Sequence, residues 1–424
     1  MKTIAFLFIF TCLFTLAPVT AYEIVQLTDD IESIFLAPQW SPDGEKLVYV
    51  SSPGWHQANI WIMDSDGNNK TQITSGLTGF GFDYPWSPDG SKIFYSSIKY
   101  WIMPGSWTYD LNTEERKRID RDFDKPVFST DYLSAIYSVI FKKVYSGSSD
   151  GKSKIVSLQW INESKLFIVE DGGNTQKLWL VYSDGTNKSL LTTLSGENTR
   201  FLWQPEGDSI LYVSKDSGNY DVWIMDSDGS GKKQLTSTPE DEYAMGIAFS
   251  PDGSKIVYAS RNTIDRTNLS SFEGFFTTVW TMDADGTNKT KLILPNANIC
   301  FYPSWSPDGT KIAIERRSDS CRYDVVAMNA DESDAAILTA DINGGAFPKW
   351  SPKGDKIAFV SLKDEKTDVS VIILDEKWRS APSESIASLP AIPQGNGKKS
   401  PGFTVPLVMI AFLIALALQK NKIE

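Results

Sequence analysis

Histidine is nearly absent from this chain, which has one such residue, His56, among 424. A metal site built from several histidines is therefore excluded, and a Ser-His-Asp triad would have a single candidate base. The segment around His56 contains no nucleophile elbow, and no glycine-rich phosphate loop follows an expected strand. The sequence thus gives poor support for catalysis, and we predict a protein that is not an enzyme and has no metal or other cofactor.

A basic stripe is also absent. Lysine and arginine total 41 against 53 acidic residues, the net charge is −12, and the cations are spread among the acids. Binding to nucleic acid depends on clustered positive charge. We therefore expect no nucleic-acid partner.

The sequence has no apolar run of full membrane length, and its two main apolar runs are shorter and lie near the two ends. Lys2 precedes an apolar run from Ile4 to Leu16, and Val19-Thr20-Ala21 resembles a small-residue cleavage site. Cys12 lies inside the run rather than at the cleavage point, which argues against a lipoprotein signal. Residues 1–21 are therefore predicted to be a signal peptide, so the mature protein is expected to be secreted.

The other end is divided into two parts. Residues 379–400 are rich in proline, serine and glycine, which predicts a flexible linker. Residues 401–424 contain Pro401-Gly402-Phe403, an apolar run from Thr404 to Leu418, and two later lysines. Fifteen apolar residues are marginal for spanning a bilayer. The segment is interpreted as a short transmembrane anchor, or as a sorting signal, since it resembles the PGF-CTERM signal of archaeal surface proteins. That resemblance implies cleavage and a lipid anchor at the cell surface.

Between these ends one phrase returns several times. Its copies are WSPDGEKLVYVSS (40–52), WSPDGSKIFYSS (86–97), FSPDGSKIVYAS (249–260), WSPDGTKIAIE (305–315) and WSPKGDKIAFVS (350–361). A second phrase follows several of them, as in NIWIMDSDGNNKTQIT (59–74) and DVWIMDSDGSGKKQLT (221–236). The apolar, β-branched runs predict strands, and Pro-Asp-Gly and Asp-Ser-Asp-Gly predict tight turns.

A four-stranded unit of about 40–45 residues is the repeat of a β-propeller blade. We count eight copies, including degenerate ones at Phe128 and Trp160, and seven is the alternative because these two are only 32 residues apart. Residues Tyr22–Thr28 read as a fourth strand without its first three, whereas the last copy ends at Leu374 without a fourth strand. We therefore predict one all-β propeller over residues 22–378, closed into a ring by its N-terminal strand.

The two phrases together resemble the TolB-type, WD40-like propeller repeat. This resemblance covers about residues 22–378 and is informative about the fold rather than the function. It also suggests an alternative function, because some TolB-like propellers belong to lyases that act on acidic sugars. Those lyases use several histidines as metal ligands, which this chain lacks.

The loops between second and third strands differ among copies, in contrast to the uniform turns. Because function on rigid scaffolds tends to reside in variable loops, and aromatic and arginine residues are enriched at binding hot spots, we predict a binding face there. Its candidate residues are Trp55, His56, Tyr100, Trp101, Phe275, Phe276, Arg316 and Arg317. The alternative is that individual aromatics only cover the blade tops.

Two further features concern covalent modification. Cys300 precedes a first strand and Cys321 a third strand, so antiparallel pairing brings both to the variable face and favours a disulfide over two free thiols. The asparagines of the Asn-x-Ser/Thr sequons, which are candidate glycan sites, are Asn69, Asn162, Asn187, Asn268 and Asn288. Three of them fall in one turn type, where asparagine is also favoured for its conformation.

The sequence thus predicts a non-enzymatic, surface-anchored propeller that binds a protein or a glycan through its variable face. Two alternatives stay open. One is an enzyme that acts on acidic polysaccharides, in which Arg316, Arg317 and His56 hold a carboxylated sugar. The other is a purely structural component of the cell envelope.

Overall fold

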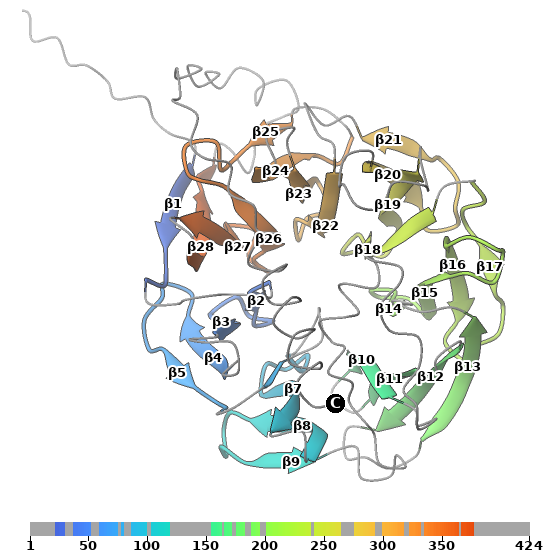
Figure 1. The fold of residues 1–424 in the computed structure, drawn as a ribbon, viewed down its shortest axis with the longest axis horizontal. Helices are drawn as coiled ribbons and strands as arrows, with labels where there is room; N and C mark the ends of the chain where they lie inside the picture. The colour runs from blue at the N-terminus through green and yellow to red at the C-terminus, as the bar shows by residue number, and fades with distance from the viewer. Residues whose placement is uncertain are drawn as a thin grey trace, which may run out of the picture.

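The computed structural model describes residues 22–29, 37–51, 59–74, 78–79, 86–99, 103–118, 154–162, 165–171, 175–182, 188–195, 201–238, 241–263, 275–292, 299–317, 322–331, 335–363 and 366–376. These residues form seven four-stranded antiparallel sheets arranged around a central axis (Figure 1). The prediction of an all-β propeller is therefore confirmed.

The strands of the first four sheets along the chain follow one another in sequence. They are β2 (Gln39–Trp40), β3 (Lys46–Ser51), β4 (Asn59–Asp64), β5 (Thr71–Gln72); β6 (Thr78–Gly79), β7 (Lys92–Lys99), β8 (Met103–Asp110), β9 (Arg116–Arg118); β10 (Lys154–Asn162), β11 (Lys165–Asp171), β12 (Thr175–Tyr182), β13 (Ser189–Ser195); and β14 (Phe201–Trp203), β15 (Ser209–Ser214), β16 (Asp221–Asp226), β17 (Lys233–Gln234).

The remaining three sheets include the one that joins the two ends of the ring. Their strands are β18 (Asp241–Phe249), β19 (Lys255–Thr263), β20 (Phe275–Asp283), β21 (Thr290–Leu292); β22 (Ile299–Trp305), β23 (Lys311–Arg317), β24 (Tyr323–Asn329), β25 (Ala336–Ile337); and β26 (Gly345–Trp350), β27 (Lys356–Lys363), β28 (Lys366–Leu374), with β1 (Tyr22–Gln26) as the fourth strand. We call this last one the closing sheet.

The predicted count of eight copies differs from the seven sheets that the described residues form. The copy expected at Trp160 is present, because Trp160 lies in β10 and pairs with Leu166. The copy expected at Phe128 falls within 119–153, outside the described residues. Its sequence lacks the Pro-Asp-Gly turn that the regular copies use, so the repeat pattern alone was a weak basis for counting it. The blade count of the whole ring stays a prediction.

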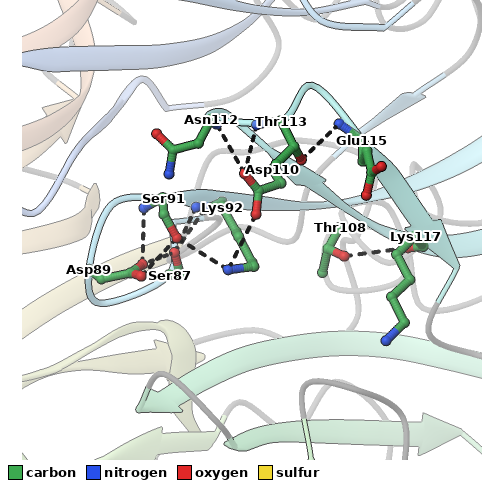
Figure 2. Close-up of polar contacts among 10 residues, drawn as sticks. All are labelled: Ser87, Asp89, Ser91, Lys92, Thr108, Asp110, Asn112, Thr113, Glu115 and Lys117. Carbon is green, nitrogen blue, oxygen red and sulfur yellow. Dashed lines mark hydrogen bonds and ion pairs between the residues drawn. The ribbon is translucent and has the colours of Figure 1, made fainter.

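The polar residues of the repeated phrase hold its turn together, as the copy beginning at Trp86 shows (Figure 2). The hydroxyl of Ser87 donates to Asp89 Oδ1 at 2.6 Å and accepts from the backbone N–H of Lys92 at 2.8 Å. The ammonium of Lys92 lies 3.5 Å from Asp110 Oδ2, at the end of the third strand. Burial alone would raise the pKa of Asp89, but the hydrogen bonds from Ser87 and Ser91 together lower it to about 2.

The same contacts recur in other sheets, which explains why the phrase recurs. Ser41, Ser250 and Ser306 each donate to the aspartate two residues later at 2.6 Å. In the closing sheet Lys353 replaces that aspartate, and Ser351 donates instead to Asp355 at 2.8 Å. The turn keeps its hydrogen bonds although one residue of the motif has changed.

Tryptophan, proline and glycine of the phrase connect neighbouring sheets. The indole N–H of Trp40 donates to the carbonyl of Lys349 in β26 at 3.0 Å, and that of Trp86 donates to the carbonyl of Gln39 in β2 at 3.3 Å. Gly90 lies against Pro42 of the preceding turn, 3.5 Å from where its Cβ would stand. Among the described residues, the repeated turns therefore contact one another between several neighbouring sheets at one end of the disc.

The N-terminal strand closes the ring, as predicted. Strand β1 pairs antiparallel with β28 from Tyr22↔Leu374 to Gln26↔Ser370, so the two ends of the described chain lie side by side at the left of Figure 1. Buried residues of β28 and of the sheets on either side, together with Leu27 and partly buried residues of β1, form shared apolar clusters. Closure thus removes apolar surface from water as well as pairing a sheet edge.

Hydrogen bonds beyond the ladder hold β1 in place. The hydroxyl of Thr28 donates to Asp368 Oδ1 at 3.0 Å and accepts from the backbone N–H of Val369 at 2.9 Å, while Gln26 Nε2 donates to Asp368 Oδ2 at 2.9 Å. We call this arrangement the Gln-Thr-Asp lock. It is found again within one continuous stretch of chain, where Thr236 and Gln234 bond Asp221 with distances of 3.0 Å.

Thr28→Val is expected to open the ring. Valine keeps the shape of threonine but leaves the N–H of Val369 unpaired, at a cost of about 1–3 kcal/mol in the free energy of unfolding. Since only this lock joins segments that are distant along the chain, residues 22–28 should also become sensitive to protease and lose protection from hydrogen exchange.

Thr236→Val is the matched control for the closing lock. It removes the same hydrogen bonds from a sheet whose strands are continuous in sequence, so we expect a similar loss of stability with no protease-sensitive N-terminus. Equal protection of residues 22–28 in both variants would show that Thr28 is not needed for closure.

Candidate binding face

The antiparallel strands give the disc two different ends. At one end, which we call the turn end, lie the turns 41–44, 87–90, 250–253, 306–309 and 351–354 together with the Asp-x-Asp-Gly turns 64–67, 226–229 and 283–286. Backbone bonds such as Ser65 N–H to Glu45 O at 2.8 Å join the two kinds of turn. The opposite end, which we call the loop end, carries the connections 52–58, 100–102, 264–274, 318–321 and 364–365, all outside the described residues.

Arg316 and Arg317, two of the predicted binding residues, end strand β23 at the loop end. Arg316 is buried, and its guanidinium lies 3.3 Å from Asp324 Oδ2. Arg317 is half-buried, with its guanidinium 5.8 Å from the centre of the Tyr323 ring. Arg316 therefore has a clear structural role in its sheet, whereas Arg317 lies closer to the surface.

Arg322, which the sequence analysis did not select, completes this cluster. Its Nε lies 2.9 Å from Asp324 Oδ1, and its Nη2 donates to the backbone carbonyls of Thr339, Ala340 and Ile342 at 2.5 to 3.0 Å. Thr339 also donates to Asp324, as Thr28 does to Asp368. Arg322 thus fixes the loop end of β24 against the segment after β25, while Arg316 joins β23 to β24 through Asp324.

The other predicted residues of the binding face lie partly or wholly outside the described side chains. Phe275 and Phe276 begin β20 and pair through their backbones with Thr263 and Asn262, which puts them at the loop end. Trp55, His56, Tyr100 and Trp101 lie outside the described residues. A binding role for this set stays a prediction.

The predicted disulfide falls in a similar position. The backbone of Cys300 pairs with that of Arg316, so Cys300 lies at the loop end of β22. Cys321 is outside the described residues, and the disulfide remains a prediction.

Two of the predicted glycan sites have a conformational explanation. Asn69 and Asn288 adopt φ values of 53° and 50°, and their side-chain amides donate to Asp64 Oδ2 at 2.6 Å and Asp283 Oδ2 at 2.7 Å. Gly231 occupies the equivalent turn position with φ 63°. A left-handed conformation is what this position requires, and asparagine and glycine are the residues that adopt it most readily.

The other sequons give less information. Asn162 ends strand β10, with only its backbone described, and Asn187 and Asn268 lie outside the described residues. Glycosylation at any of the five sites stays a prediction.

Asn69→Gly should leave the free energy of unfolding almost unchanged, whereas Asn69→Ala should lower it by about 1–2 kcal/mol, because alanine is disfavoured in the left-handed region. Denaturant titration of the two variants measures the difference. Equal stability of the two variants would mean that backbone conformation does not explain the asparagine.

Glu315 is a buried carboxyl group that the sequence analysis missed. Its Oε2 accepts a hydrogen bond of 2.9 Å from the backbone N–H of Phe347, in the neighbouring closing sheet. Burial raises the pKa of Glu315 to about 7, against a smaller lowering by that hydrogen bond. The sequence marks Glu315 only as a departure from the repeat, because the residues at the same position in other copies are uncharged. These residues are Val50, Ser96, Ala259 and Val360.

Two strained aromatic residues lie on the innermost strands beside Glu315. Tyr302 in β22 and Phe347 in β26 have φ values of 52° and 57°, and each precedes a proline. Their ring centres are 4.7 Å apart in an edge-to-face arrangement, and the strand register shifts at both positions. Such backbone conformations are uncommon for bulky residues and often occur at functional sites.

Glu315→Gln should make the protein more stable near pH 8 but not near pH 4. The carboxyl has a higher pKa folded than unfolded, so its contribution to stability falls as pH rises from about 4.5 to about 7, by on the order of 3 kcal/mol. Glutamine removes this loss while still offering an oxygen to Phe347.

Denaturant titrations at several pH values test this prediction, with the exposed Glu376→Gln as the control. The difference in stability between the Glu315 variant and the unsubstituted protein should grow from pH 4.5 to 7 and then level off. A difference independent of pH would show that Glu315 is ionised throughout.

Within the described residues, no group of three or more histidine, cysteine, aspartate or glutamate side chains is arranged to hold a metal ion. No helix in the same residues is long and apolar enough to cross a membrane. The described part of the face is thus a rigid edge of arginines, aromatic rings and one buried carboxyl group.

The architecture is that of a β-propeller, and comparisons with known proteins show that part of its sequence is similar to TolB proteins. A stretch of 142 residues is 31% identical to the Tol-Pal system protein TolB of Anaeromyxobacter dehalogenans, strain 2CP-C, and 33% identical to that of Anaeromyxobacter sp. strain K. Each match covers 34% of this chain and 29% of the length of the relative. No protein-family model matches the chain.

Solved structures show the same fold at lower identity. An oligogalacturonate lyase from Vibrio parahaemolyticus matches 85% of this chain and 96% of its own with a TM-score of 0.59 and 15% identity. The propeller domain of the trilobed protease from Pyrococcus furiosus matches 80% of this chain and 95% of its own length, with a TM-score of 0.51 and 14% identity. That propeller is described as having an open velcro topology, whereas here β1 pairs with β28.

Proposed function

We propose that this protein is a non-enzymatic binding protein of the cell envelope that engages a protein through its loop end. The observation that carries the proposal is the contrast between the two ends of the disc. At the turn end the repeated serines and aspartates bond one another and the backbone, as Ser41 does with Asp43. The connections that vary among the copies, with the aromatic and arginine candidates, all belong to the loop end.

Rigidity of the scaffold supports the same proposal. The locks at Thr28, Thr236 and Thr339 fix the outer strands, and the arginines at Asp324 fix one edge of the loop end. Loops held on a rigid frame lose less entropy on binding than loops that must also be positioned. The similarity to proteins of the Tol-Pal system favours a protein over a glycan as the ligand.

A tether at the C-terminus is also part of the proposal. The linker 379–400 and the apolar run from Thr404 to Leu418 would hold the propeller outside the cell, whether the segment remains as an anchor or is exchanged for a lipid. A signal peptide in residues 1–21 would direct the chain there.

The double variant Trp101→Ala with Phe276→Ala should lose its ligand in affinity capture from an envelope extract, while its unfolding transition stays where it was. Large aromatic side chains at binding hot spots contribute about 2 kcal/mol or more each. The matched control is Lys70→Ala with Lys289→Ala, two exposed lysines at the turn end.

Capture that survives in the loop-end variant and is lost in the turn-end variant would contradict the proposed face. Turnover of acidic oligosaccharides by the unsubstituted protein would instead support the lyase alternative, for which the shared fold is the one structural argument.

A further inference from the structure

Strand β13 differs from the outer strands of the other sheets. Among the described residues it has a neighbour, β12, on one side only, and it lies on the outside of the ring at the right of Figure 1. It has seven residues, SLLTTLS, and none is charged. The outer strands β5, β9, β17, β21 and β25 have two or three residues, and β9, β17 and β21 contain lysine or arginine. Short strands and basic side chains keep sheet edges from pairing with other chains, so β13 lacks two common protections.

The outer edge of β13 carries main-chain groups that can bind another strand. The backbone N–H of Ser195 donates to Asp216 Oδ1 at 3.0 Å, so this N–H points away from β12. Ser195 pairs with Thr175 and Thr193 pairs with Lys177, with no register shift between these pairs. Since alternate residues of an antiparallel strand direct their N–H and C=O groups to the same side, those of Thr193 also point outward. Asp216 thus covers the edge at Ser195, and the part of β13 before it is left for pairing.

The same part of β13 presents an apolar side chain. Leu190 is 46% exposed, and it is the one exposed large hydrophobic side chain among the described residues. A register shift lies between Leu178 and Trp179, so that Leu190 pairs with Trp179 while Thr193 pairs with Lys177. The side chains of Leu190 and Thr193 therefore stand on the same face of the sheet. An added strand would cover Leu190 as well as pair the main chain.

We propose that β13 pairs antiparallel with β13 of a second copy of this chain, about a two-fold axis between Leu191 and Thr192. This register sets Leu190 of each copy opposite Thr193 of the other, so both exposed leucines are covered. A two-fold contact of this kind uses the same patch on both copies, and it closes after two copies instead of continuing as a fibre.

Charge complementarity favours a second copy over an unrelated chain. In the proposed register, Lys188 of one copy lies opposite Ser195 of the other, whose N–H is held by Asp216. Both Lys188 and Asp216 are exposed. Within one copy the length of β13, about 23 Å, separates Lys188 from Ser195, so these two charges are far apart. Pairing two copies brings them together at both ends of the interface.

A charge swap tests the pairing in the full chain, with sedimentation velocity over a concentration series as the measurement. The unsubstituted chain should form a dimer. Lys188→Glu and Asp216→Lys should each raise the dimer dissociation constant by about tenfold or more, because like charges then meet at both ends of the paired strands. An equimolar mixture of the two variants should recover the dimer, since opposite charges again face each other in the mixed pair.

Two further variants separate the interface from folding. Lys289→Glu makes the same charge change at an exposed position of the turn end and should leave the dimer unchanged. Leu190→Lys adds a charge to the exposed edge and should weaken the dimer as the charge variants do. Denaturant titration of each variant should show the unfolding transition where it is in the unsubstituted chain.

A chain that is monomeric at every concentration would overturn the proposal and leave the edge to an extended segment of another protein. The proposal would also fail if all the β13 variants kept the dimer, or if the mixture of charge variants associated no better than either variant alone. The contact does not use the candidate residues of the loop end, so its outcome is independent of the proposed function.

Discussion

The whole structure depends on one contact between segments that are 340 residues apart. Thr28 bonds the carboxylate of Asp368 and the N–H of Val369, and so attaches the first strand to the last sheet. Elsewhere the same lock only strengthens a sheet whose strands are already joined by short turns. At the closing sheet it has no such support from connectivity, and residues of β1 add to the apolar clusters that the last sheet shares with its neighbours.

Repetition makes this closure possible. The sequence Gln-Leu-Thr occurs at 26–28, in the closing sheet, and at 234–236, in a sheet whose strands are continuous in sequence. The N-terminal strand therefore binds the last sheet with the same hydrogen-bond geometry as that other sheet. Similar contacts recur at the turn end, where the glycine of several copies lies against the turn of the preceding sheet and Trp40 and Trp86 donate to backbone carbonyls there. A ring assembled from one type of contact needs no special interface at its seam.

The repeat made the fold predictable, and departures from the repeat limited the rest. Gln26 to Thr28 could be assigned to the last sheet because they matched a fourth strand that lacked its partners. The count of eight copies stays a prediction, because the copy at Phe128 lacks the turn residues that mark a copy and lies outside the described residues. Arg316 was selected as a binding residue because it follows a strand at a variable loop, but the sequence does not show that Asp324, eight residues away, is its buried partner.

Glu315 illustrates why a site on a repeated scaffold is found by its irregularity. Other copies have valine, serine or alanine at this position, so the blade does not need a carboxyl group there. Burial also makes the carboxyl group of Glu315 harder to ionise. The left-handed Tyr302 and Phe347 add backbone strain in the two innermost strands beside it. Since a blade can be built without any of these features, as the other sheets show, their coincidence at one junction of the loop end is better explained by a task of that face than by folding.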